Sequence, residues 1–226
     1  MMKQRAVLAE DKEKRHDAIL DAAARLLTRA PERVASVAEV AEEAGLAKGT
    51  VYLYFPGKEA LLMALHERNV GAFFQALIAR LDSSAPLAIG EVLDVVRRHM
   101  IEPPLFLPLA SRCFGVMRQE IEPAIMLAFK QRMAGRLQRA GAGLERHFSG
   151  LEPGGGVALL RHSYALVLGL WQMSPPSKSD PAKRRDAAGA TLASPVRDDL
   201  DRALIALWHG TLVPVRAPRG VATTGA

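Results

Sequence analysis

The sequence predicts an all-α protein, and three observations support that fold class. Apolar residues recur at three- and four-residue spacing along most of the chain, as they do on one face of an amphipathic helix. No stretch keeps up the alternation of apolar and polar residues that marks a half-buried strand. Prolines and glycines fall between the periodic segments, where helices are expected to end.

Composition limits the function classes. The 226 residues, 49% of them hydrophobic, can bury a core and form one large or two small domains. A net charge of +6 favours a polyanionic partner, such as nucleic acid or an anionic membrane surface. The single cysteine, Cys113, excludes an intramolecular disulfide, and the charged N-terminus does not resemble a signal peptide. We therefore expect a cytoplasmic protein. The longest apolar run, residues 164–173, is about half of the ~20 residues that a membrane-spanning helix needs, so no membrane span is expected.

The first helix is predicted over residues 12–29. Pro31 enforces its end, because proline removes a backbone donor and clashes with the preceding turn. One face of this helix carries Ile19, Ala23, Leu26 and Leu27.

A second, short helix is predicted after Ser36. Ser36 and Glu39 have the S-x-x-E form of a capping box, in which each side chain meets the backbone N–H of the other. Gly45 is predicted to end this helix, since glycine readily takes the left-handed conformation found after a helix. Its apolar stripe consists of Val37, Val40, Ala41 and Ala44.

A third helix is predicted over residues 48–55. Two helices joined by a tight turn that contains glycine form a helix-turn-helix. Pro56 and Gly57 end the third helix, and a long helix is predicted over residues 58–81.

The third helix is unusual in its aromatic residues. Val51 and Phe55 lie four residues apart on one face and are predicted to be core. Tyr52 and Tyr54 then occupy other faces, where a rigid ring ending in a hydroxyl suits a phosphate oxygen at the edge of a DNA groove.

Residues 17–62, DAILDAAARLL…SVAEVAEEAGLAKGTVYLYFPGKEALL, resemble the DNA-binding domain of the TetR family of bacterial transcriptional regulators. The family pattern combines an alanine-rich first helix, T/S-x-x-D/E-[IV]-A-x-x-A-G, G-T-[LV]-Y-x-[YH]-F and K-E-x-L-L, and every part occurs in this chain. The chain departs from the pattern at residues 29–31, Arg-Ala-Pro, where a glycine is usual. The resemblance implies a homodimeric regulator that binds double-stranded operator DNA.

The resemblance also places the DNA contacts. Lys48 and Thr50, at the start of the recognition helix, are expected at base edges, although a solvated Lys48 is an equal alternative. Lys58 is expected at a phosphate. The full set is Ser36, Lys48, Gly49, Thr50, Tyr52, Leu53, Tyr54 and Lys58. Basic residues before the first helix could form an arm that reaches DNA or simply a solvated face; these are Lys3, Arg5, Lys12, Lys14 and Arg15.

The rest of the chain is predicted to form a helical effector-binding and dimerisation domain. The DNA-binding domain is assigned to residues 10–60, the second domain to 61–212 and a flexible tail to 213–226. Helices are predicted over residues 88–101, 105–120, 123–148, 155–173 and 197–210. Residues 174–195, rich in Pro, Ser, Ala and charge, are predicted to form a mobile loop.

The helix VALLRHSYALVLGLWQM is apolar on nearly all sides, so a second copy of the chain is its natural partner. The resemblance implies that this helix and the later segment DDLDRALIALWHGTL form a four-helix bundle across a twofold axis.

No catalytic, metal-ligating or cofactor-binding set is predicted, because the histidines His99, His147, His162 and His209 are scattered and no H-E-x-x-H or C-x-x-C spacing exists. Two functions remain. One is a repressor released from its operator by a small-molecule effector; the other is a DNA-binding protein of the same fold that organises DNA or binds a protein partner without a ligand. A cavity in the second domain would favour the first. Its predicted lining is Met100, Phe106, Phe114, Met117, Phe129, Tyr164 and Trp171.

Overall fold

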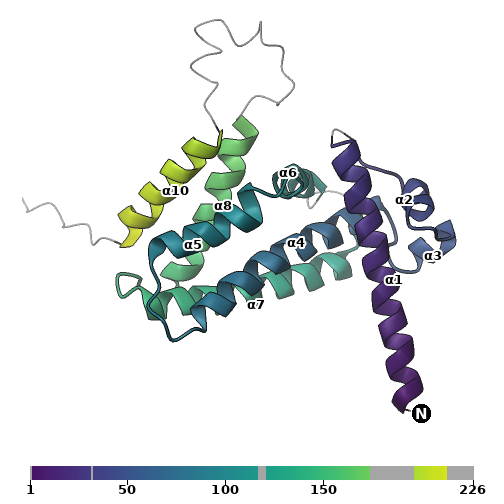
Figure 1. Ribbon diagram of the computed structural model, residues 1–226, viewed down its shortest axis with the longest axis horizontal. Coiled ribbons are helices and arrows are strands. Elements are labelled where there is room, and N and C mark those ends of the chain that lie inside the picture. Colours follow the sequence, from purple (N-terminus) through teal and green to yellow (C-terminus); the bar gives the residue numbers. More distant parts are fainter. Residues whose placement is uncertain (1, 32, 117–120, 174–195, 213–226) are drawn as a thin grey trace, which may run out of the picture.

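The computed structural model describes residues 2–31, 33–116, 121–173 and 196–212, with the side chains of residues 2–9, 114–116 and 196–197 not described. Within these ranges all the regular elements are helical, which confirms the all-α prediction (Figure 1). They are α1 (Met2–Arg29), α2 (Val37–Glu43), α3 (Lys48–Tyr52), α4 (Lys58–Leu81), α5 (Ile89–Val96), a π-helical turn η1 (Arg97–Ile101), α6 (Phe106–Val116), α7 (Pro123–His147), α8 (Gly155–Met173) and α10 (Val196–Leu212).

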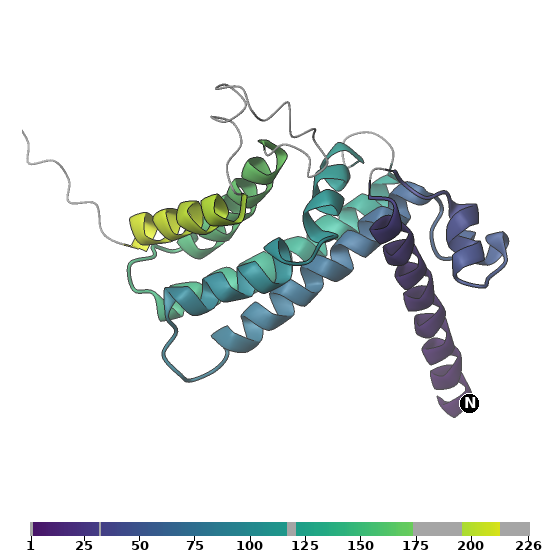
Figure 2. The ribbon, with the colours of Figure 1, turned by 45° about the horizontal axis from the view of Figure 1, so that its top comes forward.

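Helices α1, α2 and α3 form one end of the molecule, and the first half of α1 points away from the body (Figure 1, Figure 2). α1 begins at Met2, well before the predicted start at residue 12. The added turns contain neither glycine nor proline, and most of their residues favour helix. The basic residues of the predicted arm therefore lie on a continuous helix.

The third helix ends at Tyr52, so the predicted end at Phe55 is wrong. A residue that precedes proline is sterically pushed out of the helical region, and Phe55 precedes Pro56. The backbone N–H groups of Tyr54 and Phe55 still reach the carbonyl oxygen of Val51, at 3.0 and 2.9 Å. The chain therefore continues as a closed turn that leads into α4.

The remaining helices form the body of the molecule. α4 and α7 run side by side, α8 packs across α7, and α10 lies against α8 (Figure 1, Figure 2). α7 and α8 follow the predicted bounds to within one residue, and α10 is extended by a residue or two at each end. Residues 117–120 of the predicted sixth helix, the predicted loop 174–195 and the predicted tail 213–226 lie outside the described residues. No described helix is long and apolar enough to cross a membrane.

Two hydrophobic cores hold the helices. The N-terminal core joins α1, α2 and α3 to the start of α4, and it also takes in Leu109 and Cys113 of α6. The C-terminal core lies among α4, α5, α7, α8 and α10, around the fully buried Trp208. α4 belongs to both cores and α6 touches both, so these two helices connect the ends of the molecule.

Two features shape the C-terminal core. The predicted helix over residues 88–101 is split into α5 and η1, whose wider turn places both Met100 and Ile101 against the core. α7 and α8 touch backbone to backbone at Gly141 and Gly156, where an added Cβ on Gly156 would lie 2.2 Å from the Gly141 carbonyl oxygen. Only glycine permits this approach.

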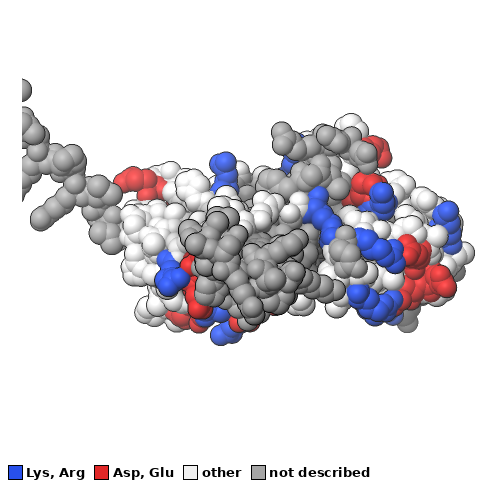
Figure 3. Space-filling model, turned by 90° about the horizontal axis from the view of Figure 1, so that it is seen from above, with Lys and Arg blue, Asp and Glu red and all other residues white. Residues whose placement is uncertain are grey.

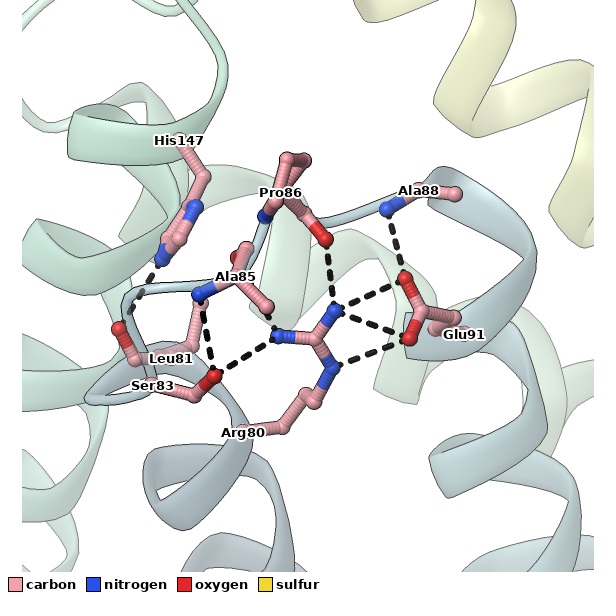
Figure 4. Close-up of polar contacts among 8 residues, drawn as sticks. All are labelled: Arg80, Leu81, Ser83, Ala85, Pro86, Ala88, Glu91 and His147. Atoms are coloured by element: carbon pink, nitrogen blue, oxygen red, sulfur yellow. Dashed lines mark hydrogen bonds and ion pairs between the residues drawn. The ribbon is translucent and has the colours of Figure 1, made fainter.

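A salt bridge fixes the turn between α4 and α5 (Figure 4). The guanidinium of Arg80 contacts the Glu91 carboxylate at 2.8 Å and donates to the Pro86 carbonyl oxygen at 2.7 Å. Glu91 in turn accepts the backbone N–H of Ala88 at 2.9 Å. That N–H, and then Arg80, lower the pKa of Glu91. The turn is thereby held closed, and α5 is fixed relative to α4.

Candidate DNA-binding surface and internal cavity

The start of α2 is fixed by the predicted capping box, which the structure confirms. The Glu39 backbone N–H donates to Ser36 Oγ at 3.3 Å, and the Ser36 N–H donates to Glu39 Oε2 at 2.8 Å. Arg33 lies 2.7 Å from the same carboxylate. Arg33 and the Ser36 N–H lower the pKa of Glu39 to about 2, so the cap stays ionised at neutral pH.

The turn between α2 and α3 depends on Gly45, whose φ of +66° lies in the left-handed region predicted for it. The Leu46 N–H reaches back to the Ala41 carbonyl oxygen at 2.8 Å. α3 is then held by Val51 and Phe55, which are 0% and 4% exposed in the N-terminal core. This anchoring fixes which side chains of α3 face outward.

The outward face of α3 carries basic, aromatic and aliphatic side chains together. Lys48 and Gly49 are exposed, and Lys48 Nζ lies 5.8 Å from the ring centroid of Tyr52. Tyr52 is 46% exposed and Leu53 is 83% exposed. An exposed leucine beside an exposed tyrosine has no packing role within this chain, and both can contact a partner.

The other predicted contact residues lie around this face. Thr50 is half-buried, whereas Ser36 and Lys58 are exposed, with Lys58 Nζ 3.6 Å from Glu59 Oε1 in the first turn of α4. Tyr54 is half-buried against the N-terminal core, its ring centroid 6.5 Å from that of His16. Tyr54 therefore also packs, and the expectation of a purely outward tyrosine applies to Tyr52.

The charges near this surface are of both signs. On the face seen in Figure 3, basic and acidic side chains lie together over the end of the molecule that carries α2 and α3. Glu43 of α2 bonds to Arg29 and Arg25 of α1, which lower its pKa to about 2. These pairs join α1 to α2 and leave Lys48 and Lys58 as basic groups on the outer side.

A cavity of about 420 Å³ lies inside the other end of the molecule, between α4, the end of α5, η1, α7 and α8. Such a volume is within the range of small-molecule sites, about 300–1,000 Å³. Its walls are mainly apolar and aromatic. The lining residues are His66, Val70, Phe73, Phe74, Val96, Met100, Phe129, Met133, Leu137, Leu160, Arg161, His162, Ser163, Tyr164 and Ala165.

Of the predicted lining residues, Met100, Phe129 and Tyr164 lie in the wall of this cavity. Phe106 does not line this cavity; it is 1% exposed and packs edge-on against His66, with 5.7 Å between the ring centroids. Trp171 does not line this cavity either and packs at the edge of the C-terminal core. The Phe114 side chain and Met117 lie outside the described residues.

The predicted lining contains none of the residues that α4 contributes to the cavity wall. Val70, Phe73 and Phe74 recur at helical spacing, which made them indistinguishable from core residues in the sequence. His66 gave the one available signal, because it is a titratable residue one turn before Val70 on an otherwise apolar face. Within the described ranges, no group of three or more His, Cys, Asp or Glu side chains is placed to hold a metal ion.

Salt bridges connect the two sites along α4. Arg68 lies 2.7 Å from Asp21 of α1, and the adjacent Glu67 binds Arg132 at 2.7 Å and Arg136 at 3.3 Å on α7. All of these residues except Asp21 border an open groove of about 610 Å³ between α1, α4 and α7. Consecutive residues of α4 thus hold the DNA-binding end on one side and the cavity-bearing end on the other.

Comparison with known proteins finds a family match for each of the two parts of the chain. Residues 19–65 match the bacterial regulatory proteins of the tetR family, and residues 67–215 match the tetracyclin repressor-like C-terminal domain. A curated relative, the fatty acid metabolism regulator protein of Bacillus subtilis, is 36% identical over 59 residues. That match covers 26% of this chain and only 30% of the relative.

Solved structures of low identity share the fold. The fatty acid degradation regulator FadR from Bacillus halodurans aligns with a TM-score of 0.50 at 19% identity, over 90% of this chain and 97% of its own. A TetR-family transcriptional regulator from Mesorhizobium loti aligns with a TM-score of 0.54 at 19% identity, over 88% and 96%. Because the match over residues 67–215 alone covers more than half of the chain, the chain belongs to the TetR family of bacterial transcriptional regulators.

Proposed function

We propose that this regulator binds a near-palindromic operator through α3 and the adjoining ends of α2 and α4, and that a small molecule in the cavity releases it. The observation that carries the proposal is the exposed face of α3, where Lys48, Tyr52 and Leu53 have no role in packing. The N-terminal end of a recognition helix enters the major groove. Lys48 and Thr50 at that end would meet base edges, together with the backbone at Gly49.

The remaining contacts would position the protein on the phosphate backbone. Tyr52, Tyr54 and Lys58 can reach phosphate oxygens from the end of α3 and the start of α4, and Ser36 can do so from the start of α2. Leu53 offers an apolar contact to a thymine methyl group. In this division residues 10–60 bind DNA, and residues 61–212 bind the effector and dimerise.

The apolar surface of α8 and α10 supports a homodimer. Met173 at the end of α8 is 76% exposed, and Ile205 of α10 is 44% exposed. Trp171 and Leu207 are only half-buried within one chain. A twofold bundle of α8 and α10 would cover these side chains, and it would place two α3 helices about one DNA turn, ~34–36 Å, apart.

Release would act through α4. Its first turn carries Lys58, and its later turns supply His66, Val70, Phe73 and Phe74 to the cavity wall. A ligand that shifts this wall also shifts the start of α4, and with it the spacing of the two α3 helices. The cavity itself favours a repressor with an effector over a protein of the same fold that organises DNA without a ligand.

Selection of duplexes from a randomised pool tests the DNA-binding part. The selected sites should be near-palindromic, and light scattering should show a dimer at micromolar concentration. Selected sites that footprint as a single half-site, or a monomer that binds them fully, would contradict the proposal.

A further inference from the structure

The chemistry of the cavity wall is set by which polar groups are buried in it. Five of its lining residues carry polar side chains, and two of these, Arg161 and His162, are exposed at the surface of α8. His66 and Ser163 are 2% and 4% exposed. Tyr164 is half-buried and contributes a hydroxyl. The interior therefore offers an imidazole and two hydroxyls among aromatic and aliphatic side chains.

One of the hydroxyls is already committed to the fold. Ser163 Oγ donates to the Leu159 carbonyl oxygen at 2.8 Å and accepts the indole N–H of Trp208 at 2.9 Å. The serine thus joins α8 to the buried tryptophan of α10. The other two polar groups of the interior are His66 and Tyr164, whose Nε2 and hydroxyl oxygen lie 3.3 Å apart.

This pair is uncharged. Burial lowers the pKa of His66 to about 4, so the imidazole is neutral at pH 7, and burial raises the pKa of Tyr164, so the phenol keeps its proton. The nearby carboxylate of Glu67 is engaged by Arg132 and Arg136 in the groove outside the cavity. No buried cation or anion lines the described part of the cavity wall.

The imidazole has one unmet hydrogen bond. Among the described residues, His66 Nδ1 is buried and has no partner. An unpaired buried polar group is destabilising, so such a group is usually satisfied in the functional state. A neutral imidazole can donate or accept at either nitrogen according to its tautomer. The pair can therefore receive a hydroxyl as well as a carbonyl oxygen.

We propose that the effector is an uncharged amphiphile, an apolar chain or ring system with one neutral oxygen function, a hydroxyl, ketone or ester, that hydrogen-bonds to the His66 and Tyr164 pair. The inference rests on the proposed function and specifies its ligand class. A carboxylate or ammonium group is disfavoured inside the cavity, because an unpaired buried ion is far more costly than a buried hydroxyl. A charged ligand could pair only at the surface, a carboxylate beside Arg161.

The test is a binding series at constant chain length on the full-length protein. Octan-1-ol, octan-2-one, octanoate, octylammonium and octane compete against N-phenyl-1-naphthylamine, an uncharged fluorescent probe. Octan-1-ol and octan-2-one should bind about tenfold more tightly than octane, and also than either ion, as expected for one added hydrogen bond in a site without buried charge.

Two variants assign the hydrogen bond. Tyr164→Phe removes only the hydroxyl, and His66→Phe replaces the imidazole with an apolar ring. Both should lower the preference for octan-1-ol over octane, His66→Phe to about equal affinity, while probe binding persists. Arg161→Ala is the matched control on the exposed side of the lining, and it should change nothing.

The opposite pattern would overturn the ligand class. Octanoate binding more tightly than octan-1-ol, with the advantage lost in Arg161→Ala, would place a carboxylate at the surface. Equal affinity for octane and octan-1-ol in the unaltered protein would show that the pair makes no contact.

The same ligands added to a complex with a selected operator separate this inference from the proposed function. Release by octanoate alone would remove the ligand class and leave the regulatory function. Tight binding of octan-1-ol with unchanged operator affinity would uphold the ligand class and contradict effector-driven release.

Discussion

The two hydrophobic cores of this chain support function in opposite ways. The N-terminal core is fully apolar, and the residues proposed to act, Lys48, Tyr52 and Leu53, lie on its outside. The C-terminal core encloses a cavity, and the residues proposed to act there, His66 and Tyr164, lie within its wall. An outward face needs only a rigid backbone to position it. The wall of a cavity depends on how several helices that are distant in the sequence pack together, so it is more easily lost.

A substitution at the contact between α7 and α8 should destabilise the C-terminal region more than any other change considered below. Gly156→Ala places a Cβ 2.2 Å from the Gly141 carbonyl oxygen, and backbone atoms cannot move aside as a flexible side chain does. We expect a loss of about 3 kcal/mol in the free energy of unfolding, measured by urea denaturation.

The control is Gly135→Ala on the exposed face of α7, where nothing lies within 4 Å of the added Cβ. This variant should gain about 0.5–1 kcal/mol, because alanine favours helix over glycine. Equal effects of the two variants would show that the close approach is not required.

Acid pH should weaken the C-terminal core through His66. Its pKa is lowered to about 4 in the folded chain, so the unfolded chain binds the proton first as pH falls below about 6.5. Stability from this source is complete above that pH and is lost as pH falls toward 4. The loss between pH 7.5 and pH 5 should be about 2 kcal/mol.

Comparison with His66→Phe isolates this contribution. The variant should lack that part of the pH dependence in urea titrations, whatever its absolute stability at pH 7.5. Glu67, Arg132 and Arg136 lie close to this region in both proteins and cancel from the difference. Parallel stability curves for the two proteins between pH 7.5 and 5 would contradict a neutral buried histidine.

The proposed DNA contacts divide into two classes that should fail differently. Lys48→Ala should relax the preference at one operator position and cost about 1–3 kcal/mol per half-site. Lys58→Ala should weaken binding to all sequences about equally and lower the salt slope by about one per half-site. Tyr54→Phe should weaken binding with little change in slope.

Anisotropy titrations across a salt series, with matched and mismatched operators, measure these effects. A sequence-selective loss in Lys58→Ala, or a uniform loss in Lys48→Ala, would reverse the assigned roles. Because Tyr54 is half-buried beside His16, its variant also needs a melting curve to separate packing from contact.

The smallest effect is expected at the salt bridges between α1 and α2. Arg29, and then Arg25, lower the pKa of Glu43 to about 2. Its stabilising contribution should therefore be present above about pH 4.5 and be lost as pH falls toward 2. Glu43→Gln should melt slightly below the unaltered protein at pH 7, and the two should converge at pH 2. Glu42→Gln, at an exposed neighbouring position, is the control, and a similar decrease there would contradict a specific role of these salt bridges.

The N-terminal unit was largely predictable because local rules specify it. Ser36 and Glu39 form the cap that their spacing predicts, and Gly45 adopts the conformation that only glycine takes readily. The errors there were also local. α3 ends earlier than predicted because Pro56 restricts the backbone of the residue before it. α1 begins earlier than predicted because the charged residues before residue 12 also favour helix.

The cavity was only partly predictable, because its walls come from five separate elements. Met100, Phe129 and Tyr164 were identified by residue type, but a wall residue and a core residue obey the same helical periodicity. Phe106 was assigned to the wall for that reason, although it packs behind His66. Which apolar residues leave space between them depends on long-range packing, which spacing along one helix does not report.

The most direct test of the account is reciprocal linkage between the two ends. A ligand that occupies the cavity should weaken operator affinity by some factor, and operator binding must then weaken the affinity for that ligand by the same factor. Titrating octan-1-ol into the protein with and without saturating operator, and operator with and without saturating octan-1-ol, gives both factors. We expect equal factors of about 5–150, the usual range of coupling. Saturation of the cavity with unchanged operator affinity would contradict the account.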